Sequence, residues 1–467
     1  MRRLSLVAVT SAVLAAAGGG VASAHPLGNF TINHYAGLAV RPDTVIIDYV
    51  IDMAEIPAFQ ERSAIDRDGD GVLSEAELAA YGAARCDALR SGLSVRIDGH
   101  GLPLSMAGAT ATLPVGQAGL STLRLGCLYS TPLGVETSDR SRLLEFADVN
   151  YAERIGWREI TARGDGVHLD TSLPTTSLSA RLSAYPQDLL ASPLDVRRGA
   201  IRFTGAGPAM DPATPAQRGP AIDGRPADPL ASLIGQAEVS PIGVLAALLL
   251  ALGLGAFHAL TPGHGKTVLA AYLVGTRGTR RQALFLALAV ALSHTAGVLG
   301  LAVLTLAGSA VLAPERAYPY LSTVSGALVV VLGAWMVATR ARHAHAHHHG
   351  HEHDRPTTAL GWRSLAALGL AGGLVPSASA LVLLLGAISL HRSELGLVLV
   401  VAFGLGMAAV LVGVGQALVG ARGLAERRLA EHGRFRAAIA AAPSLAAVTV
   451  LLLGLGMTAQ SLAALLG

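Results

Sequence analysis

The chain has 467 residues, of which 52% are hydrophobic and only 14% are charged, and its formal net charge is +3. This balance excludes a large soluble enzyme and is typical of a membrane protein. No basic stretch interleaved with aromatic residues marks a nucleic-acid binder. Because the long apolar runs all lie after residue 239, we expect a soluble half followed by a membrane half.

Residues 1–24 have the pattern of a secretory signal peptide. Two arginines precede an apolar core over 4–17, and the small residues 22–24 form a cleavage site. A retained membrane anchor is the alternative. If the signal is cleaved, the next domain is extracytoplasmic. In that oxidising compartment we expect Cys86 and Cys127 to form a disulfide, with two free buried thiols as the alternative.

Residues 25–200 are predicted to form an extracytoplasmic, mostly β domain. Short segments rich in Val, Ile, Thr and Leu recur between Gly, Pro and Asp residues, which favours a small β-sandwich. The predicted strands cover 45–51, 93–97, 121–129 and 155–162. His25 and His34 could capture metal together with a new α-amine. We favour the simpler interpretation, an exposed N-terminus with an ordinary surface histidine.

A helical insertion over 54–89 interrupts the β domain. Its centre, residues 66–77, fits the calcium loop of an EF-hand, with Gly71 at the sharp turn. The expected oxygen ligands are Asp66, Asp68, Asp70, the Val72 carbonyl, Ser74 and Glu77. An acidic turn without an ion is the alternative. Because no second EF-hand follows and calcium is plentiful outside the cell, we predict that Ca²⁺ stiffens the domain structurally.

Residues 201–239 are rich in Pro, Gly and Ala and are predicted to be a linker. Residues 240–467 then predict an α-helical polytopic membrane domain with six spans. The apolar segments lie near 240–262, 282–308, 320–340, 363–390, 394–420 and 443–466. The apolar residues 267–275 rise only about 14 Å as a helix, so we expect a half-helix and not a span.

Arginine placement predicts the orientation of the six spans. The loops after the first, third and fifth spans are rich in arginine, whereas those after the second and fourth hold only Arg316 and Arg392. The positive-inside rule therefore places the arginine-rich loops in the cytoplasm of a bacterial-type plasma membrane. The N-terminal domain and the C-terminus are then extracytoplasmic.

The two halves of the membrane domain share a proline inside an apolar segment. Residues 260–262 are similar to 374–376, which predicts a 3+3 inverted repeat with paired broken helices. Pro262 removes the helical partner of the His258 carbonyl. A break there allows His258 and His264 to converge, although they lie about 120° apart on a straight helix. Two imidazoles and free carbonyls at this depth indicate a transition-metal site.

Further histidines extend this prediction. His294 lies near the middle of its span and is expected to be a third membrane ligand, with a helix–helix hydrogen bond as the alternative. The predicted cytoplasmic loop 341–355 carries a tract of imidazoles that favours ions such as Ni²⁺, Co²⁺, Cu²⁺ and Zn²⁺. The tract consists of His343, His345, His347, His348, His349, His351 and His353. A solvated low-complexity loop is the alternative.

Several motifs in 240–467 resemble the nickel/cobalt exporter (NicO) family. They are residues 258–267, 293–295 and 373–376 together with the histidine tract. The related nickel/cobalt permeases share the spacing from His258 to His264, but Gly263 replaces their aspartate, which argues against uptake. The resemblance implies a secondary transporter that moves Ni²⁺ or Co²⁺ outward, with the three membrane histidines as ligands.

Other functions remain open at this point. Uptake would use the same site. A thiol–disulfide electron carrier would need intramembrane cysteines, and the sequence has none after Cys127. A calcium-dependent, membrane-anchored metal-binding or sensing protein would explain the EF-hand but not the membrane histidines. No nucleophile–base arrangement indicates an enzyme. No nucleotide motif is recognisable, so a proton or ion gradient is expected to drive transport.

Overall fold

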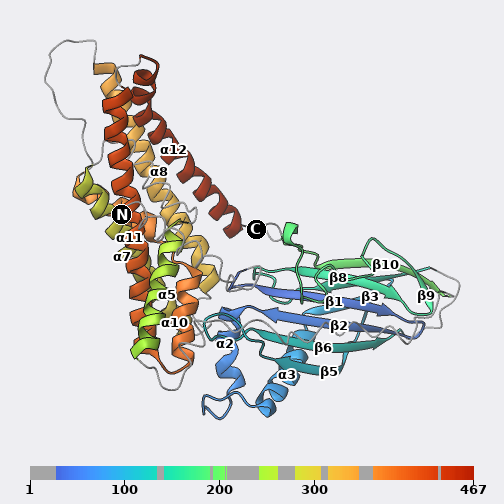
Figure 1. The fold of residues 1–467 in the computed structure, drawn as a ribbon. Helices are drawn as coiled ribbons and strands as arrows, with labels where there is room; N and C mark the ends of the chain where they lie inside the picture. Colours follow the sequence, from blue (N-terminus) through green and yellow to red (C-terminus); the bar gives the residue numbers. More distant parts are fainter. Residues whose placement is uncertain are drawn as a thin grey trace, which may run out of the picture. The chain divides into compact units, whose positions relative to one another are not determined.

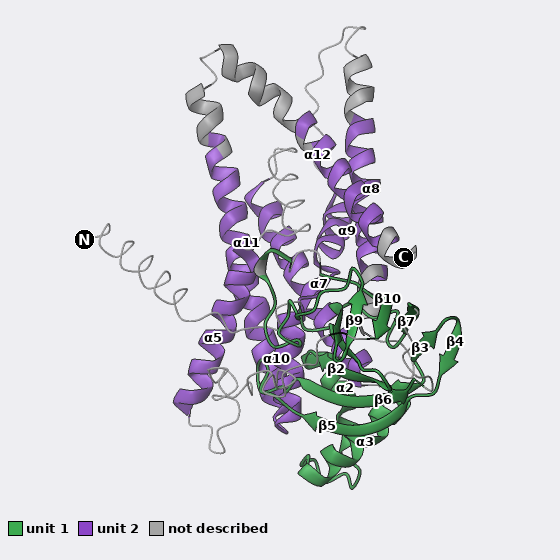
Figure 2. Cartoon of the chain, turned by 90° about the vertical axis from the view of Figure 1, so that its right-hand side faces the viewer, with its two compact units in different colours: residues 1–232 green, residues 233–467 purple. Residues whose placement is uncertain are grey.

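The computed structural model divides the chain into two compact units, Met1–Ser232 and Leu233–Gly467 (Figure 2). The described residues are 28–133, 141–189, 193–205, 207, 241–260, 279–306, 314–346, 361–429 and 433–466. The predicted signal peptide at 1–24 and most of the predicted linker lie outside these ranges.

The first unit is built on two five-stranded β-sheets (Figure 1). The first has the order β5-β6-β2-β1-β8, with β1 and β8 parallel and the other neighbours antiparallel. Its strands are β1 (Ile32–Val40), β2 (Thr44–Met53), β5 (Ser105–Thr112), β6 (Leu123–Pro132) and β8 (Arg158–Gly164). The second is antiparallel with the order β4-β3-β7-β10-β9. Its strands are β3 (Leu93–Ile97), β4 (His100–Leu102), β7 (Arg142–Asp148), β9 (Val167–Asp170) and β10 (Arg198–Gly205).

Alternation of side chains builds the core between the two sheets. On β6, Leu125, Cys127 and Tyr129 are buried, while the residues between them are partly or fully exposed. They belong to one apolar cluster with Leu144 and Phe146 of β7, a strand of the other sheet. Burying such a side chain stabilises a fold by about 1.5–3 kcal/mol. The shared core therefore holds the sheets face to face, and the predicted mostly β domain is confirmed.

Two helices follow β2 and precede β3 in the sequence, namely α2 (Glu55–Ile65) and α3 (Glu75–Arg90). Ser74 caps α3, because its hydroxyl accepts from the Glu77 amide while the Glu77 carboxylate accepts from the Ser74 amide. A disulfide joins Cys86 of α3 to Cys127 of β6, with their Cα atoms 5.6 Å apart. This is the pair predicted from the sequence, and it ties α3 to the first sheet.

Strand β10 corrects the predicted domain limit at residue 200. Ile201 and Phe203 are buried in the core, and Arg202 between them is exposed. This is the period of a strand with one buried face. Residues 201–205 therefore belong to the second sheet and not to the linker.

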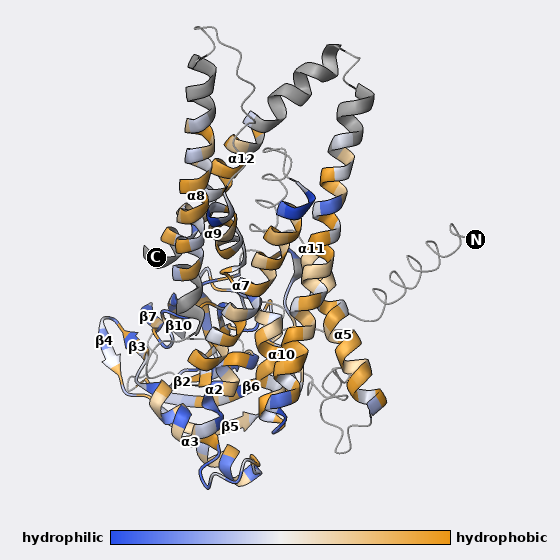
Figure 3. Ribbon diagram, turned by 90° about the vertical axis from the view of Figure 1, so that its left-hand side faces the viewer, coloured by the Kyte–Doolittle hydropathy of each residue, from blue (hydrophilic) through white to orange (hydrophobic). Residues whose placement is uncertain are grey.

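The described part of the second unit is helical, and its helices are predominantly apolar (Figure 3). They are α5 (Pro241–Leu260), α7 (Arg280–Leu306), α8 (Pro314–Ala346), α9 (Trp362–Gly373), α10 (Ala378–Ser389), α11 (Ser393–Leu429) and α12 (Gly433–Leu466). Apolar side chains that stay exposed on a helix surface are expected where lipid replaces water.

Four helices among the described residues are long and apolar enough to cross a membrane. They are α5, α7, the part of α8 over Tyr320–Thr339 and the part of α11 over Ser393–Ala421. Helices α9 and α10 together form one further segment, bent by 69°. In α12 the apolar stretch is shorter, Ala447–Leu462. A multi-pass helical domain is therefore present, while six spans and a 3+3 repeat stay predictions. The predicted half-helix at 267–275 lies outside the described residues.

Helix α8 corrects the start of the predicted loop 341–355, because it continues to Ala346. His343 and His345 consequently lie on a helix. The residues around them are alanine and arginine, which favour helix, so the end of the apolar stretch does not end the helix.

Glycine allows α5 and α11 to pack closely. A Cβ atom at Gly255 would collide with the backbone of Phe403, and one at Gly406 would collide with the backbone of Leu252. Small residues permit this close approach of membrane helices. The contact brings Phe403 to the last turn of α5, where His258 lies.

Candidate metal centre

His258 of α5 and His294 of α7 lie side by side inside the second unit. Their ring centroids are 5.4 Å apart and the ring planes are tilted by 39°. His294 is buried, His258 is half-buried, and the Phe403 ring lies 5.7 Å from that of His258. With metal–nitrogen distances of about 2.1 Å, two imidazoles on one ion have centroids no more than about 6.5 Å apart. The distance between the two rings is therefore within the range for two ligands of one ion.

The break between α9 and α10 packs directly on the turn of α7 that carries His294. Helix α9 ends at Gly373, where a Cβ atom would collide with the Ser293 hydroxyl and the Val290 carbonyl. The Ser293 hydroxyl also donates to the Gly369 carbonyl, at 3.1 Å. Within the break, the Leu374 carbonyl would lie 3.3 Å and the Pro376 Cβ 3.5 Å from a Cβ at position 297 of α7. The end of α9 and the break itself are thus in close contact with α7.

Ser377 begins α10 and contacts His294 directly. Its backbone N–H donates to His294 Nε2 at 3.1 Å, and its hydroxyl accepts from the Ala380 N–H, also at 3.1 Å. The hydroxyl is a normal N-cap. The first contact fixes the tautomer, because Nε2 must carry a lone pair in order to accept. The ring proton of a neutral His294 is then on Nδ1.

Of the predicted metal ligands, His258 and His294 come together in the described residues. His264, Pro262 and Gly263 lie outside these residues, so the predicted convergence of His258 with His264 stays a prediction. In the histidine tract, His343 and His345 are placed on α8 by their backbone only. The remaining tract residues, His347, His348, His349, His351 and His353, lie outside the described ranges.

The acidic loop between α2 and α3 gathers three carboxylates. Oxygen atoms of Asp66, Asp68 and Asp70 lie within 4.8 Å of one another. Asp66 accepts from the Gly69 and Gly71 amides, at 2.9 and 3.0 Å. Gly71 has φ +82°, the left-handed conformation that the sixth loop position requires. The loop therefore has the backbone turn and the oxygen donors that suit a hard cation such as Ca²⁺.

Glu77, the last predicted calcium ligand, is partly exposed, and its carboxylate accepts several hydrogen bonds. Its Oε2 accepts from the Ser74 amide at 2.9 Å and the Ser74 hydroxyl at 2.7 Å, and its Oε1 accepts from the Arg67 amide at 2.8 Å. The hydrogen bond from the Ser74 backbone is the main cause that lowers the pKa of Glu77 to about 2. The carboxylate is thus turned toward the loop that it is predicted to close.

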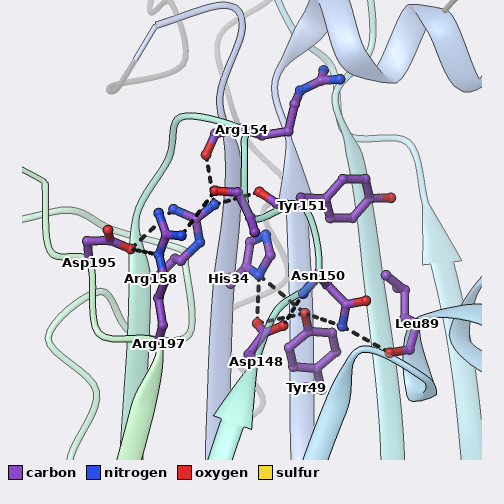
Figure 4. A network of polar contacts seen from close by, with 11 residues as sticks. His34, Tyr49, Leu89, Asp148, Asn150, Tyr151, Arg154, Arg158, Asp195 and Arg197 are labelled. Atoms are coloured by element: carbon purple, nitrogen blue, oxygen red, sulfur yellow. Dashed lines mark hydrogen bonds and ion pairs between the residues drawn. The ribbon is translucent and has the colours of Figure 1, made fainter. Parts of the chain in front are cut away.

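A second polar network, around His34, lies inside the first unit (Figure 4). His34 Nδ1 lies 2.7 Å from Asp148 Oδ2, and the Tyr49 hydroxyl donates to the same oxygen at 2.9 Å. The Asn150 side chain donates to the Tyr49 hydroxyl and the Leu89 carbonyl, at 3.3 and 2.9 Å. Since a carboxylate only accepts, His34 Nδ1 must be the donor. This network links β1, β2 and the end of β7.

The burial of His34 corrects the expected surface histidine. The His34 ring is enclosed by Tyr49, Tyr151 and Asp148, and His34 is 2% exposed. Its Nε2 is buried and has no hydrogen-bond partner among the described residues. Burial is the main cause that lowers the pKa of His34, Asp148 opposes it, and Arg158 and Arg197 lower the pKa further. These arginines also make this a poor place for a cation.

Sequence comparison identifies the membrane unit. The NicO family model, described as high-affinity nickel-transport protein, matches residues 244–362. A protein of Methanocaldococcus jannaschii, named as a candidate nickel/cobalt efflux system, is 32% identical over 37% of this chain and 76% of its own length. The nickel/cobalt efflux system RcnA of Escherichia coli K12 is 30% identical over 35% of this chain and 75% of its own length. The RcnA protein of Shigella sonnei is likewise 30% identical.

The chain belongs to the NicO family of nickel/cobalt transporters. The resemblance found in the histidine and proline motifs is thereby confirmed. The NicO match includes both His258 and His294. No solved structure matches the chain.

Sequence reasoning on this NicO protein missed two groups at the centre. Phe403 gives no signal, since phenylalanine is ordinary in a membrane helix. The amide of Ser377 is a backbone group, so residue type does not reveal it. The available signal was Pro376, which directly precedes Ser377. A proline there indicates a helix break, and the first amides of the helix that starts after the break have no partner within that helix.

Proposed function

We propose that this protein exports Ni²⁺ or Co²⁺ through a membrane site that includes His258 and His294. The observation that carries the proposal is the pair of imidazoles from two helices, 5.4 Å apart, beside a broken third helix segment. Imidazole nitrogen suits these borderline metals. The names of the relatives, nickel/cobalt efflux systems, support the metal and the outward direction.

The proposal includes a third ligand and an orientation. His264 is the third ligand, brought toward His258 by a break at Pro262. The chain crosses the membrane six times as a 3+3 inverted repeat, with the first unit and the C-terminus extracytoplasmic. The histidine tract then faces the cytoplasm and supplies ions to the site. A proton or ion gradient drives transport, since a protonated imidazole cannot hold metal and proton exchange can release it.

Metal flux in proteoliposomes tests the site. His258→Ala and His294→Ala should each reduce Ni²⁺ or Co²⁺ flux to background at matched protein levels, because no bulk water replaces a lost ligand at that depth. Deleting 343–353 should lower flux without abolishing it, since the tract histidines are redundant. His391→Asn is the matched control. His391 is exposed beyond α10 with φ +58°, a conformation that asparagine tolerates. Wild-type flux in both alanine variants removes the proposed site.

A deletion strain tests the direction of transport. Loss of an exporter lowers the nickel or cobalt concentration that the cells tolerate and raises the metal that they accumulate. Loss of an uptake protein reduces accumulation and does not lower tolerance. Uptake is the second candidate function, because the same ligands would serve it.

We also propose that the acidic loop binds Ca²⁺ as a structural ion. Asp66, Asp68 and Asp70 already place carboxylate oxygens within 4.8 Å of one another, and α2 and α3 flank the loop. The Val72 carbonyl, Ser74 and Glu77 complete the donor set. Bound Ca²⁺ would offset the mutual repulsion of the loop carboxylates and hold α2 against α3. The alternative is a calcium-dependent, membrane-anchored metal-binding or sensing protein, which would show no metal flux in proteoliposomes.

A further inference from the structure

The lone pair of His294 Nε2 is already in use. The Ser377 N–H donates to it at 3.1 Å, and both groups are buried. An imidazole nitrogen has one in-plane lone pair, so it can accept this hydrogen bond or bind a metal, but not both. A metal that binds Nε2 must therefore displace the Ser377 N–H.

Binding through the other ring nitrogen leads to the same conflict. For Nδ1 to bind a metal, the ring proton must move to Nε2. An Nε2–H would then point at the Ser377 N–H, and two donors cannot share a hydrogen bond. Either mode of binding to a neutral His294 thus breaks the contact with Ser377.

We propose that metal binding at His294 releases the Ser377 amide, and with it the first turn of α10, from α7. The inference rests on the proposed function, since it takes His294 as a metal ligand. Ser377 is in this sense a positioning residue, because its amide holds the His294 ring while the site is empty of metal. Metal bound to His294 and the hydrogen bond from Ser377 to His294 therefore exclude each other.

The hydrogen bond from the Ser377 N–H to His294 is important for how the break packs on α7. Pro376 has no N–H of its own, so the amide after it, that of Ser377, is the first that the chain can offer. The segment meets α7 through backbone and small groups, at Gly373 against Ser293 and at the Leu374 carbonyl against Gly297. Such a contact adjusts as a unit, since no long side chain can absorb a small shift. Loss of the amide contact therefore changes how α10 begins.

A pair of Ser377 variants separates the amide from the hydroxyl. Ser377→Pro and Ser377→Ala both lose the hydroxyl that caps Ala380, but only proline lacks the N–H. Ser377 has φ −83°, close to the value that proline requires. Removing one competing hydrogen bond should tighten Ni²⁺ binding about two- to tenfold in Ser377→Pro. Ser377→Ala should bind within about twofold of the wild type, because its amide remains.

Hydrogen exchange of the full chain in nanodiscs provides the readout. A chelator buffer fixes the free Ni²⁺ concentration, so Ni²⁺ bound by the histidine tract does not change it. Peptides that cover 377–385 report on the start of α10. We expect Ni²⁺ to raise exchange at the start of α10 in the wild type and in Ser377→Ala. In Ser377→Pro the Ni²⁺ titration midpoint should fall as stated above. In His294→Ala exchange should be high without Ni²⁺ and should not change when it is added.

The outcomes distinguish this inference from the proposed function. A wild type that transports Ni²⁺ while exchange at the start of α10 stays unchanged or falls overturns the release of Ser377 and leaves the transport site intact. A wild type with neither flux nor a change in exchange removes both. If Ser377→Pro does not fold, hydrogen exchange in the wild type and in His294→Ala, each with and without Ni²⁺, decides alone. If His294 had a purely structural role, exchange at the start of α10 in the wild type would not change with Ni²⁺.

Discussion

Acid should destabilise the first unit through His34. The folded unit holds this imidazole buried, with Nδ1 donating to Asp148 and Nε2 without a partner among the described residues. A second proton would sit on Nε2 and place a buried charge near Arg158 and Arg197, both of which lower the pKa of His34. In the unfolded chain the pKa returns to about 6.5. The unfolded state therefore binds more protons between the lowered pKa and 6.5.

The sign and the size of the effect follow from proton linkage. Stability rises with pH wherever the unfolded state holds more protons, so it is complete above about pH 6.5 and is lost as the pH falls toward the folded pKa. The slope approaches about 1.4 kcal/mol per pH unit for one histidine. For a domain of this size that corresponds to about 3–6 °C in melting temperature per pH unit.

A fragment over 25–207 allows the measurement. Trp157 is the only tryptophan in it and is fully buried, so its fluorescence reports unfolding. His34→Gln keeps an N–H donor for Asp148 but does not titrate, and it should flatten the slope between pH 7.5 and 5.5 in excess Ca²⁺. His100→Gln changes an exposed histidine and should keep the wild-type slope. Equal slopes in wild type and His34→Gln refute the reasoning. A wild type that is more stable at pH 5.5 shows that Asp148 outweighs burial.

Two further predictions concern the calcium loop and the topology. Glu77→Gln should reduce the rise in melting temperature that Ca²⁺ causes, because a tenfold weaker site loses about 1.4 kcal/mol of stabilisation at saturating ion. The control Glu75→Gln lies in the same turn of α3 but not at a ligand position, and equal Ca²⁺ responses in the two variants contradict the EF-hand. A single cysteine introduced at position 347 should react only with membrane-permeant reagents in intact cells, since the histidine tract is proposed to be cytoplasmic. Labelling from outside reverses the orientation.

The strands that could be predicted from the sequence are those with dense apolar alternation. Strands β2, β3, β6 and β8 correspond to the four predicted segments. Strand β5, with the sequence SMAGATAT, offers few large apolar residues, and its place in the sheet depends on pairing with β6 and on packing of α3. Gly82 of α3 fits against Ala111 of β5, a contact that only the folded chain creates.

The site could be predicted only as far as residue types carry information. Histidines inside apolar segments indicated a metal site, and prolines indicated breaks. The burial of His34 was missed because its partner Asp148 is 114 positions away, and no local pattern marks such a pair. Likewise, the distance between His258 and His294 reflects how α5 and α7 each pack against α11, through glycines such as Gly255 and Gly404 that look like any other glycine in these apolar segments.

A helix that starts inside a membrane has backbone amides that need hydrogen-bond acceptors. An amide left without an acceptor is unfavourable in hydrocarbon, so the start of α10 needs acceptors close by. The Ser377 hydroxyl serves the Ala380 amide, and His294 Nε2 serves the Ser377 amide. If His294 binds metal as proposed, metal binding and this second hydrogen bond exclude each other. The affinity of the proposed site would then be set by a difference, the free energy of the metal–imidazole bond minus the free energy of the lost hydrogen bond from Ser377. Such a difference keeps binding reversible, which a transporter requires and a storage site does not.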